Sequence, residues 1–193
     1  YEPYWESWVR AALVHLLKQW GKVADALQEC ERVLPLVQSR MPLLEHCTLT
    51  YLGDIHYHQG DWRASEQFYR RALQLEQQAH LSLRLAEPTV QLAHLLLQRN
   101  EATLALALLE KPLTALRQEG LRALAEPFAA YWTGYQVFKA NADPRADAIL
   151  QEAYQRLLAK ATQLDDPALH QSFLEAVRVN RLILDAGHAA GLA

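Results

Sequence analysis

Glycine and proline are scarce in this chain, with 7 glycines and 8 prolines among 193 residues. The turns of a many-stranded sheet draw heavily on these two residues, so their scarcity argues against an all-β fold. Hydrophobic residues make up 51% of the sequence. The most frequent residue types include alanine, leucine, glutamine, glutamate and arginine, which favour helices. The composition therefore predicts an all-α fold.

An excess of charge of one sign is also missing. The 22 acidic and 19 basic residues are interspersed and give a net charge of −3. Nucleic-acid binding needs a basic surface that neutralises phosphates, so we expect no direct nucleic-acid contact. Apolar runs such as Leu95-Leu96-Leu97 are far shorter than the ~20 residues of a membrane span, and no signal segment opens the chain. We therefore expect no membrane contact and a cytoplasmic location.

Motifs of catalysis and metal binding are absent as well. The sequence contains no GxSxG, Walker-type phosphate loop, HExxH or GxGxxG pattern. Cys30 and Cys47 lack the spacing of metal ligands and are interpreted as small apolar core residues. Asp54 and His58 stand four residues apart, which permits a pair on one helix face or two metal ligands, but no spacing supplies the other ligands. We expect neither enzyme activity nor a bound metal or cofactor.

A pattern of small residues recurs along the chain. Its clearest copy has Gly53, the turn Gly60-Asp61, and then Ser65, Tyr69 and Ala72. The turn positions of successive copies are 39, 40 and 41 residues apart, at Gly21, Gly60, Asn100 and Asn141. Two helices approach closely only where small side chains face each other, and glycine or asparagine tolerates the left-handed backbone that ends a helix. The pattern therefore predicts successive helix pairs.

The copy around Gly53 to Ala72 resembles the tetratricopeptide repeat. The resemblance implies an all-α, right-handed superhelical solenoid of four helix pairs in a single domain over residues 1–193. The repeats are expected at about 5–38, 43–79, 84–118 and 124–163. Because the spacing exceeds the usual repeat of about 34 residues, longer helices are expected. The expected helices cover about 5–19, 22–38, 43–58, 62–79, 84–98, 101–118, 124–140 and 144–163.

The C-terminal part begins with Asp165-Asp166-Pro167, an N-cap followed by a first-turn proline, which predicts a capping helix over about 167–186. The segment 171–177 is similar to the C-terminal end of repeat regions in large bacterial signalling ATPases and transcriptional regulators. Those proteins often carry proline where this chain has Arg178. The resemblance implies a role in signal transduction or transcription regulation. Because the chain begins Tyr1-Glu2-Pro3 without an initiator methionine, we expect a fragment of a larger protein.

In tetratricopeptide proteins the first helix of each pair lines a concave groove, and the resemblance implies which side chains do so here. His15, Asp54, His94 and Tyr135 occupy equivalent positions and are expected to form a row. The complete set of expected partner-binding residues is His15, Asp54, Tyr57, His94, Tyr131, Trp132 and Tyr135. For the aromatic residues, packing in the core is an equal alternative, and the histidines are open to a purely structural or solvated role.

The leading hypothesis is a non-catalytic protein-interaction or ligand-sensing module. Its groove would bind a peptide, a partner protein or domain, including other domains of its own parent chain, or a small effector. The alternative is a structural oligomerisation segment that self-associates through the convex face or the last helix. Polar, accessible groove positions would favour binding, whereas a large apolar patch left exposed at one end would favour association.

Overall fold

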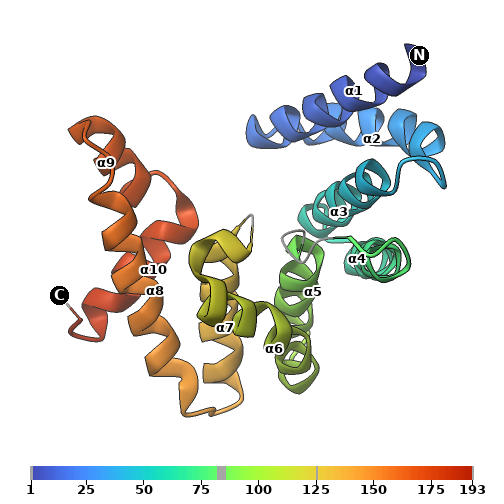
Figure 1. Cartoon of the computed structure of the whole chain (residues 1–193). Helices are drawn as coiled ribbons and strands as arrows, with labels where there is room; N and C mark the ends of the chain where they lie inside the picture. Colours follow the sequence, from blue (N-terminus) through green and yellow to red (C-terminus); the bar gives the residue numbers. More distant parts are fainter. Residues whose placement is uncertain (1, 82–85, 125, 193) are drawn as a thin grey trace. The chain divides into compact units, whose positions relative to one another are not determined.

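The computed structural model describes residues 2–81, 86–124 and 126–192, which form helices joined by turns and short loops, without a β-strand (Figure 1). Residues 84 and 85, the expected start of the third repeat, lie outside the described ranges. The eight helices of the repeats begin and end within three residues of the predicted bounds. They are α1 (Glu2–Gln19), α2 (Val23–Val37), α3 (Pro42–His58), α4 (Trp62–Gln78), α5 (Glu87–Gln98), α6 (Ala102–Glu119), α7 (Pro127–Ala140) and α8 (Arg145–Ala161).

The chain forms two compact units, Tyr1–Leu95 and Leu96–Ala193, which divide within α5. In the first unit, α1 packs on α2, α2 on α3, and α3 on α4. In the second unit, α6 packs on α7 and α7 on α8. A short 3-10 helix, η2 (Gly120–Ala123), follows α6 and contacts both α6 and α7. Each unit is therefore built from neighbouring helices in chain order, as a helical repeat requires.

The turns inside the helix pairs use the left-handed backbone that the sequence predicts. Gly21, Gly60 and Asn100 have φ angles of 69°, 81° and 62°. In the fourth turn, however, the left-handed residue is Ala142 (φ 51°), whereas Asn141 has φ −90°. The prediction placed the turn correctly but assigned the left-handed backbone to the wrong residue.

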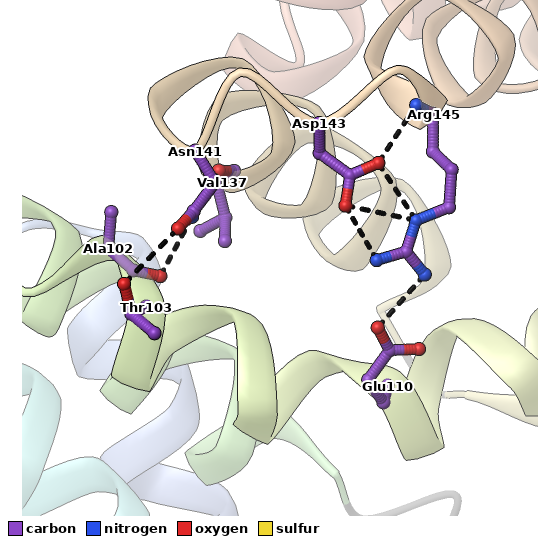
Figure 2. A network of polar contacts seen from close by, with 7 residues as sticks. All are labelled: Ala102, Thr103, Glu110, Val137, Asn141, Asp143 and Arg145. Atoms are coloured by element: carbon purple, nitrogen blue, oxygen red, sulfur yellow. Dashed lines mark hydrogen bonds and ion pairs between the residues drawn. The ribbon is translucent and has the colours of Figure 1, made fainter.

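Asn141 instead uses its side chain to hold the fourth turn against α6 (Figure 2). Its Nδ2 donates to the carbonyl of Ala102, at 2.9 Å, and to that of Val137, at 2.8 Å. Nearby, Arg145 pairs with Asp143 at 2.7 Å and with Glu110 of α6 at 2.9 Å. The turn between α7 and α8 is thus fastened to α6 by an amide and an ion-pair network.

We expect Asn141→Ala to destabilise the second unit by about 1–2 kcal/mol, because it removes two hydrogen bonds to carbonyl groups at helix ends. Chemical denaturation followed by circular dichroism measures the loss. Thr103→Ala is the matched control, since the exposed Thr103 hydroxyl lies 3.4 Å from Asn141 Oδ1. Its cost should stay below about 0.5 kcal/mol. An equal loss in both variants would contradict the assignment of the clamp to the Asn141 amide.

Small residues mark the closest helix contacts, as predicted. A Cβ atom built on Gly53 of α3 would lie 2.5 Å from Cδ1 of Tyr69 on α4. One built on Gly134 of α7 would lie 2.9 Å from Cδ1 of Ile149 and 3.1 Å from Cδ1 of Leu113. Around these contacts the first unit buries an apolar cluster contributed by α1, α2 and α3, which consists of Val14, Leu17, Ala26, Cys30, Leu52 and Ile55.

The C-terminal capping segment differs from the prediction. Two helices, α9 (Pro167–Glu175) and α10 (Arg178–Ala189), replace the single helix expected over 167–186. Asn180 Nδ2 donates to the carbonyl of Phe173 at 2.9 Å and so ties α10 to α9. Gly187 of α10 packs directly against the ring of Tyr154 on α8. The predicted cap is therefore a pair of helices at the end of the second unit, and its second helix, α10, makes a close contact with α8.

Candidate functional site

The expected binding side chains come from the first helices of the pairs, and in the first unit some of them meet across helices. His15 of α1 is exposed and Tyr51 of α3 is half-buried. Their ring centroids are 6.1 Å apart, and His15 Nδ1 lies 3.4 Å from Tyr51 Oη. Burial, followed by nearby Cys47 and Glu87, raises the pKa of Tyr51. The phenol therefore stays protonated at neutral pH and can donate to an imidazole nitrogen.

A second cross-helix contact joins α3 to α5. The rings of Tyr57 and His94 have centroids 5.7 Å apart, and both side chains are half-buried. Tyr57 also makes an edge contact with exposed His58, with centroids 5.6 Å apart. The two pairs show that α1, α3 and α5 present aromatic and imidazole groups to one another. We call His15, Tyr51, Tyr57 and His94 the first-unit surface.

Asp54, expected in the same row, lies inside the first unit. Its side chain is buried, with 6% of the residue exposed, and Oδ1 accepts a hydrogen bond of 2.7 Å from Tyr69 Oη on α4. Burial and the nearby Asp54 carboxylate raise the pKa of Tyr69, so the donor remains protonated. The buried Asp54 carboxylate therefore holds α3 against α4 through this hydrogen bond.

Tyr131 has a similar place in the second unit. It is 1% exposed, and its hydroxyl donates to Glu152 Oε1 of α8 at 2.8 Å. Arg156 Nε donates to the same carboxylate oxygen at 2.9 Å. Burial and the bond to Glu152 raise the pKa of Tyr131. Tyr131 is therefore a core residue, which is the alternative interpretation given above, because its ring is buried and its hydroxyl joins α7 to α8.

The remaining expected residues of α7 gather at the surface of the second unit. Trp132 and Tyr135 are half-buried, with ring centroids 5.5 Å apart. Lys139 Nζ lies 5.5 Å from the centroid of the Tyr135 ring and 3.3 Å from its hydroxyl. We call Trp132, Tyr135 and Lys139 the second-unit surface. It offers stacking area next to a cation, which suits aromatic, amide or acidic groups.

Two charged residues near these surfaces, Lys139 and Glu87, were not expected from the sequence. Lys139 stands four residues after Tyr135, so helical spacing alone was a usable signal. Glu87 begins α5, and its charge adds to the effect of burial, which is the main cause of the raised pKa values of Cys47, Tyr51 and Tyr69. Its position opposite α3 depends on how the helices pack, and the sequence carries no local signal of it.

The histidine-rich end of α3 does not assemble a metal centre. His56 stacks on Phe68 with ring centroids 5.2 Å apart, and its Nδ1 lies 3.9 Å from Asp61 Oδ2. Within residues 2–81, 86–124 and 126–192, no group of three or more histidine, cysteine, aspartate or glutamate side chains is placed to hold a metal ion. The helices described in those ranges also include none with the length and apolarity needed to cross a membrane.

The solved structures that resemble the chain include two helical-repeat proteins. BtubC (BKLC) from P. vanneervenii aligns with a TM-score of 0.64 and 18% identity over 93% of this chain and 77% of that chain. A putative kinesin light chain with nearly identical TPR-like repeats, from Podosopora anserina, aligns with a TM-score of 0.62 and 14% identity over 94% of this chain and 92% of that chain. No family model and no curated protein matches the sequence. At these identities the likeness concerns the fold alone.

Proposed function

We propose that this chain, which has the helical-repeat fold of TPR-like proteins, is a non-catalytic protein-interaction module. Its ligand would be an extended peptide or a segment of a partner domain, bound by the first helices. The observation that carries the proposal is the pair of cross-helix contacts His15 to Tyr51 and Tyr57 to His94. Groups from three successive first helices that meet at partly exposed positions suit a ligand that runs across the repeats.

The chemistry of both surfaces supports a peptide or protein ligand. Tyrosine and tryptophan supply rigid apolar area with a polar edge, and such residues dominate binding energy at many interfaces. Imidazole nitrogens and the Lys139 ammonium add donors that orient amide or carboxylate groups. In this proposal Asp54 and Tyr131 act indirectly, because they fix α3 and α7 through buried hydrogen bonds to the second helices.

The proposed setting is a larger cytoplasmic bacterial signalling or transcription-regulating protein, in which binding to these surfaces is passed to other domains of the parent. This setting rests on the sequence resemblance of residues 171–177 and on the repeat architecture. In a narrower version of the proposal, the ligand is a small effector that binds the first-unit surface. The aromatic and imidazole groups that meet on α1, α3 and α5 of the first unit support it.

Alanine substitutions at Tyr57 and Tyr135 are expected to weaken partner binding by about 1–2 kcal/mol each, which is roughly a tenfold rise in Kd per site. The partner is first identified by affinity capture on the immobilised chain followed by quantitative mass spectrometry, with the double variant as the reference bait. Calorimetry then gives the Kd for each variant. Trp62→Ala is the matched control, because Trp62 is an exposed aromatic residue on the second helix α4.

The control separates the first helices from the second helices. If Tyr57→Ala and Tyr135→Ala bind as tightly as the unmodified chain while Trp62→Ala loses binding, the second helices carry the interaction and the proposal fails. Circular dichroism of every variant shows whether the helices are intact. Both tyrosines are only half-buried, so the melting temperature should change little.

A further inference from the structure

The helix α1 carries apolar residues on two opposite sides. Its inner side, with Ala11, Val14 and Leu17, is buried against the rest of the first unit. The other side is apolar too, yet Trp5 is 68% exposed and Trp20 is 64% exposed. A contiguous apolar patch that stays exposed on a protein often marks a surface for association. The exposed side of α1 therefore has the character of an interface.

The exposed residues form one continuous stripe along the helix. The outer stripe consists of Trp5, Val9, Ala12, Leu13, Leu16 and Trp20. Apart from the adjacent Ala12 and Leu13, successive members are three or four residues apart, so they share one side of α1, and Trp20 directly follows the last residue of the helix. Val9 is 66% exposed and Leu16 is 46% exposed. The ion pair of Arg10 with Glu6, at 2.8 Å, lies beside the stripe and provides a polar rim.

The order of residues in the outer stripe is symmetric about the midpoint between Ala12 and Leu13. Trp5 and Trp20 lie equally far from that midpoint, and so do Val9 and Leu16. When two copies of such a helix pack antiparallel, each residue faces the residue at the mirrored position. Tryptophan then meets tryptophan at both ends, and an aliphatic residue meets an aliphatic residue between them. This self-complementarity is what an interface with two-fold symmetry requires.

We propose that the outer stripe of α1 binds the outer stripe of a second copy of this chain, with the two helices antiparallel about a two-fold axis. This homodimer goes beyond the peptide-binding role proposed above, because it uses a different side of α1 from the contact between His15 and Tyr51. The self-association alternative drawn from the sequence placed the interface on the convex face or the last helix. The structure places the strongest candidate on the first helix instead.

The size of the outer stripe is sufficient for a specific dimer. Its six side chains expose on the order of 500 Å² per copy, so that pairing two copies would bury about 1,000 Å². That area reaches the lower limit of specific protein interfaces, and the tryptophans at its ends are the residue type most enriched in binding energy. A reversible dimer is therefore expected rather than an obligate one.

The other exposed apolar residues do not form a comparable patch. Leu169 of α9 is 59% exposed and Leu104 of α6 is 55% exposed. Each stands without a row of large exposed apolar residues on its own helix, among the residues that the structure describes. They serve as matched controls, because an acidic residue at either position adds the same charge at a similar exposure.

The test is sedimentation equilibrium of the purified chain over a concentration series from about 1 µM to about 1 mM. The unmodified chain should pass from one 22.0 kDa mass to twice that mass. Val9→Glu combined with Leu16→Glu should raise the dimer Kd at least tenfold, because the antiparallel register sets two carboxylates opposite each other at both positions. Leu169→Glu should leave the Kd unchanged.

A charge exchange tests the register itself. Val9→Glu combined with Leu16→Lys sets opposite charges against each other only if residue 9 of one copy faces residue 16 of the second copy. This variant should dimerise at least tenfold more tightly than the doubly acidic variant. A parallel pairing, in which residue 9 faces residue 9, gives no such recovery.

Three results would overturn the proposal. The first is a chain that stays monomeric throughout the concentration series. The second is a doubly acidic variant that dimerises as well as the unmodified chain, and the third is a dimer that dissociates when Leu169 is replaced. Circular dichroism should show unchanged helix content in all variants, since every substituted site is exposed. Loss of the dimer leaves the peptide-binding test with Tyr57 and Tyr135 unaffected, so the two proposals fail separately.

Discussion

Gly53→Ala should destabilise the first unit, Tyr1–Leu95, by about 3 kcal/mol and lower its Tm by roughly 12–24 °C. The added methyl group falls on the ring of Tyr69, whose Cδ1 lies 2.5 Å from the Cβ position. The ring is 1% exposed, and its hydroxyl is held by Asp54, so it has neither space nor freedom to move away. The clash outweighs the helix propensity of about 1 kcal/mol that alanine gains over glycine.

Urea denaturation of the unmodified and variant chains measures this loss. Ala24→Leu is the control for adding a side chain to a helix, because Ala24 is exposed on α2. Its stability should stay within about 0.5 kcal/mol of the unmodified chain. Tyr69→Leu supplies the second arm of a double-mutant cycle. Without the ring, Gly53→Ala should cost less than about 1 kcal/mol. Equal costs with and without the ring would show that α3 and α4 do not meet at Gly53.

Lowering the pH from 6.5 to about 4 should cost the first unit about 3 kcal/mol through His46 alone. His46 of α3 is 2% exposed, and burial lowers its pKa to about 4 from 6.5. The unfolded chain therefore takes up this proton at a higher pH than the folded chain. Stability is fully present above pH 6.5 and declines as the pH falls toward 4, because protons bind preferentially to the unfolded state.

The surroundings of His46 explain why the neutral form persists. Burial disfavours the imidazolium, and neither ring nitrogen has a hydrogen-bond partner among the described residues. Oε2 of Glu76 on α4, at 4.0 Å from Nε2, is too far away for a hydrogen bond. We expect His46→Leu to remove this part of the pH dependence. The free energy of unfolding of both chains is measured between pH 7.5 and pH 4.5. Curves that run parallel over this range would show that His46 takes up its proton equally in both states.

The sequence predicted the repeats well because their signals are local. Glycine or asparagine at Gly21, Gly60 and Asn100 matches a left-handed backbone at each turn, which few other residues tolerate. Gly53 marked the closest approach of α3 to α4 for a similarly local reason, since only a residue without a side chain fits there. Ala142 escaped prediction because alanine has no intrinsic preference for the left-handed region, and the side-chain hydrogen bonds of Asn141 fix the turn instead.

The break between α9 and α10 was missed because residues 173–177 contain neither glycine nor proline. No residue that commonly ends a helix therefore stands between Glu175, where α9 ends, and Arg178, where α10 begins.

For the candidate site, helical spacing identified side chains in the same register on the first helices but not the burial of each one. His15, Tyr57, His94, Trp132 and Tyr135 remain partly or fully exposed. Asp54 and Tyr131 were assigned to the same surface because they share the helical register. Their burial depends on Tyr69 and Glu152, which approach from the second helices and stand 15 and 21 residues away in the sequence. The sequence pattern of one helix does not reveal a hydrogen-bond partner that lies on another helix.

The placement of the two cysteines makes the folded chain slow to react with thiol reagents. Cys30 is fully buried in the apolar cluster, whereas Cys47 is half-buried and its thiol pKa is raised to about 11, mainly by burial. Alkylating reagents attack the thiolate, which these surroundings suppress. Cys30 belongs to the first unit. The rate at which a reagent labels Cys30 therefore reports the opening of that unit alone.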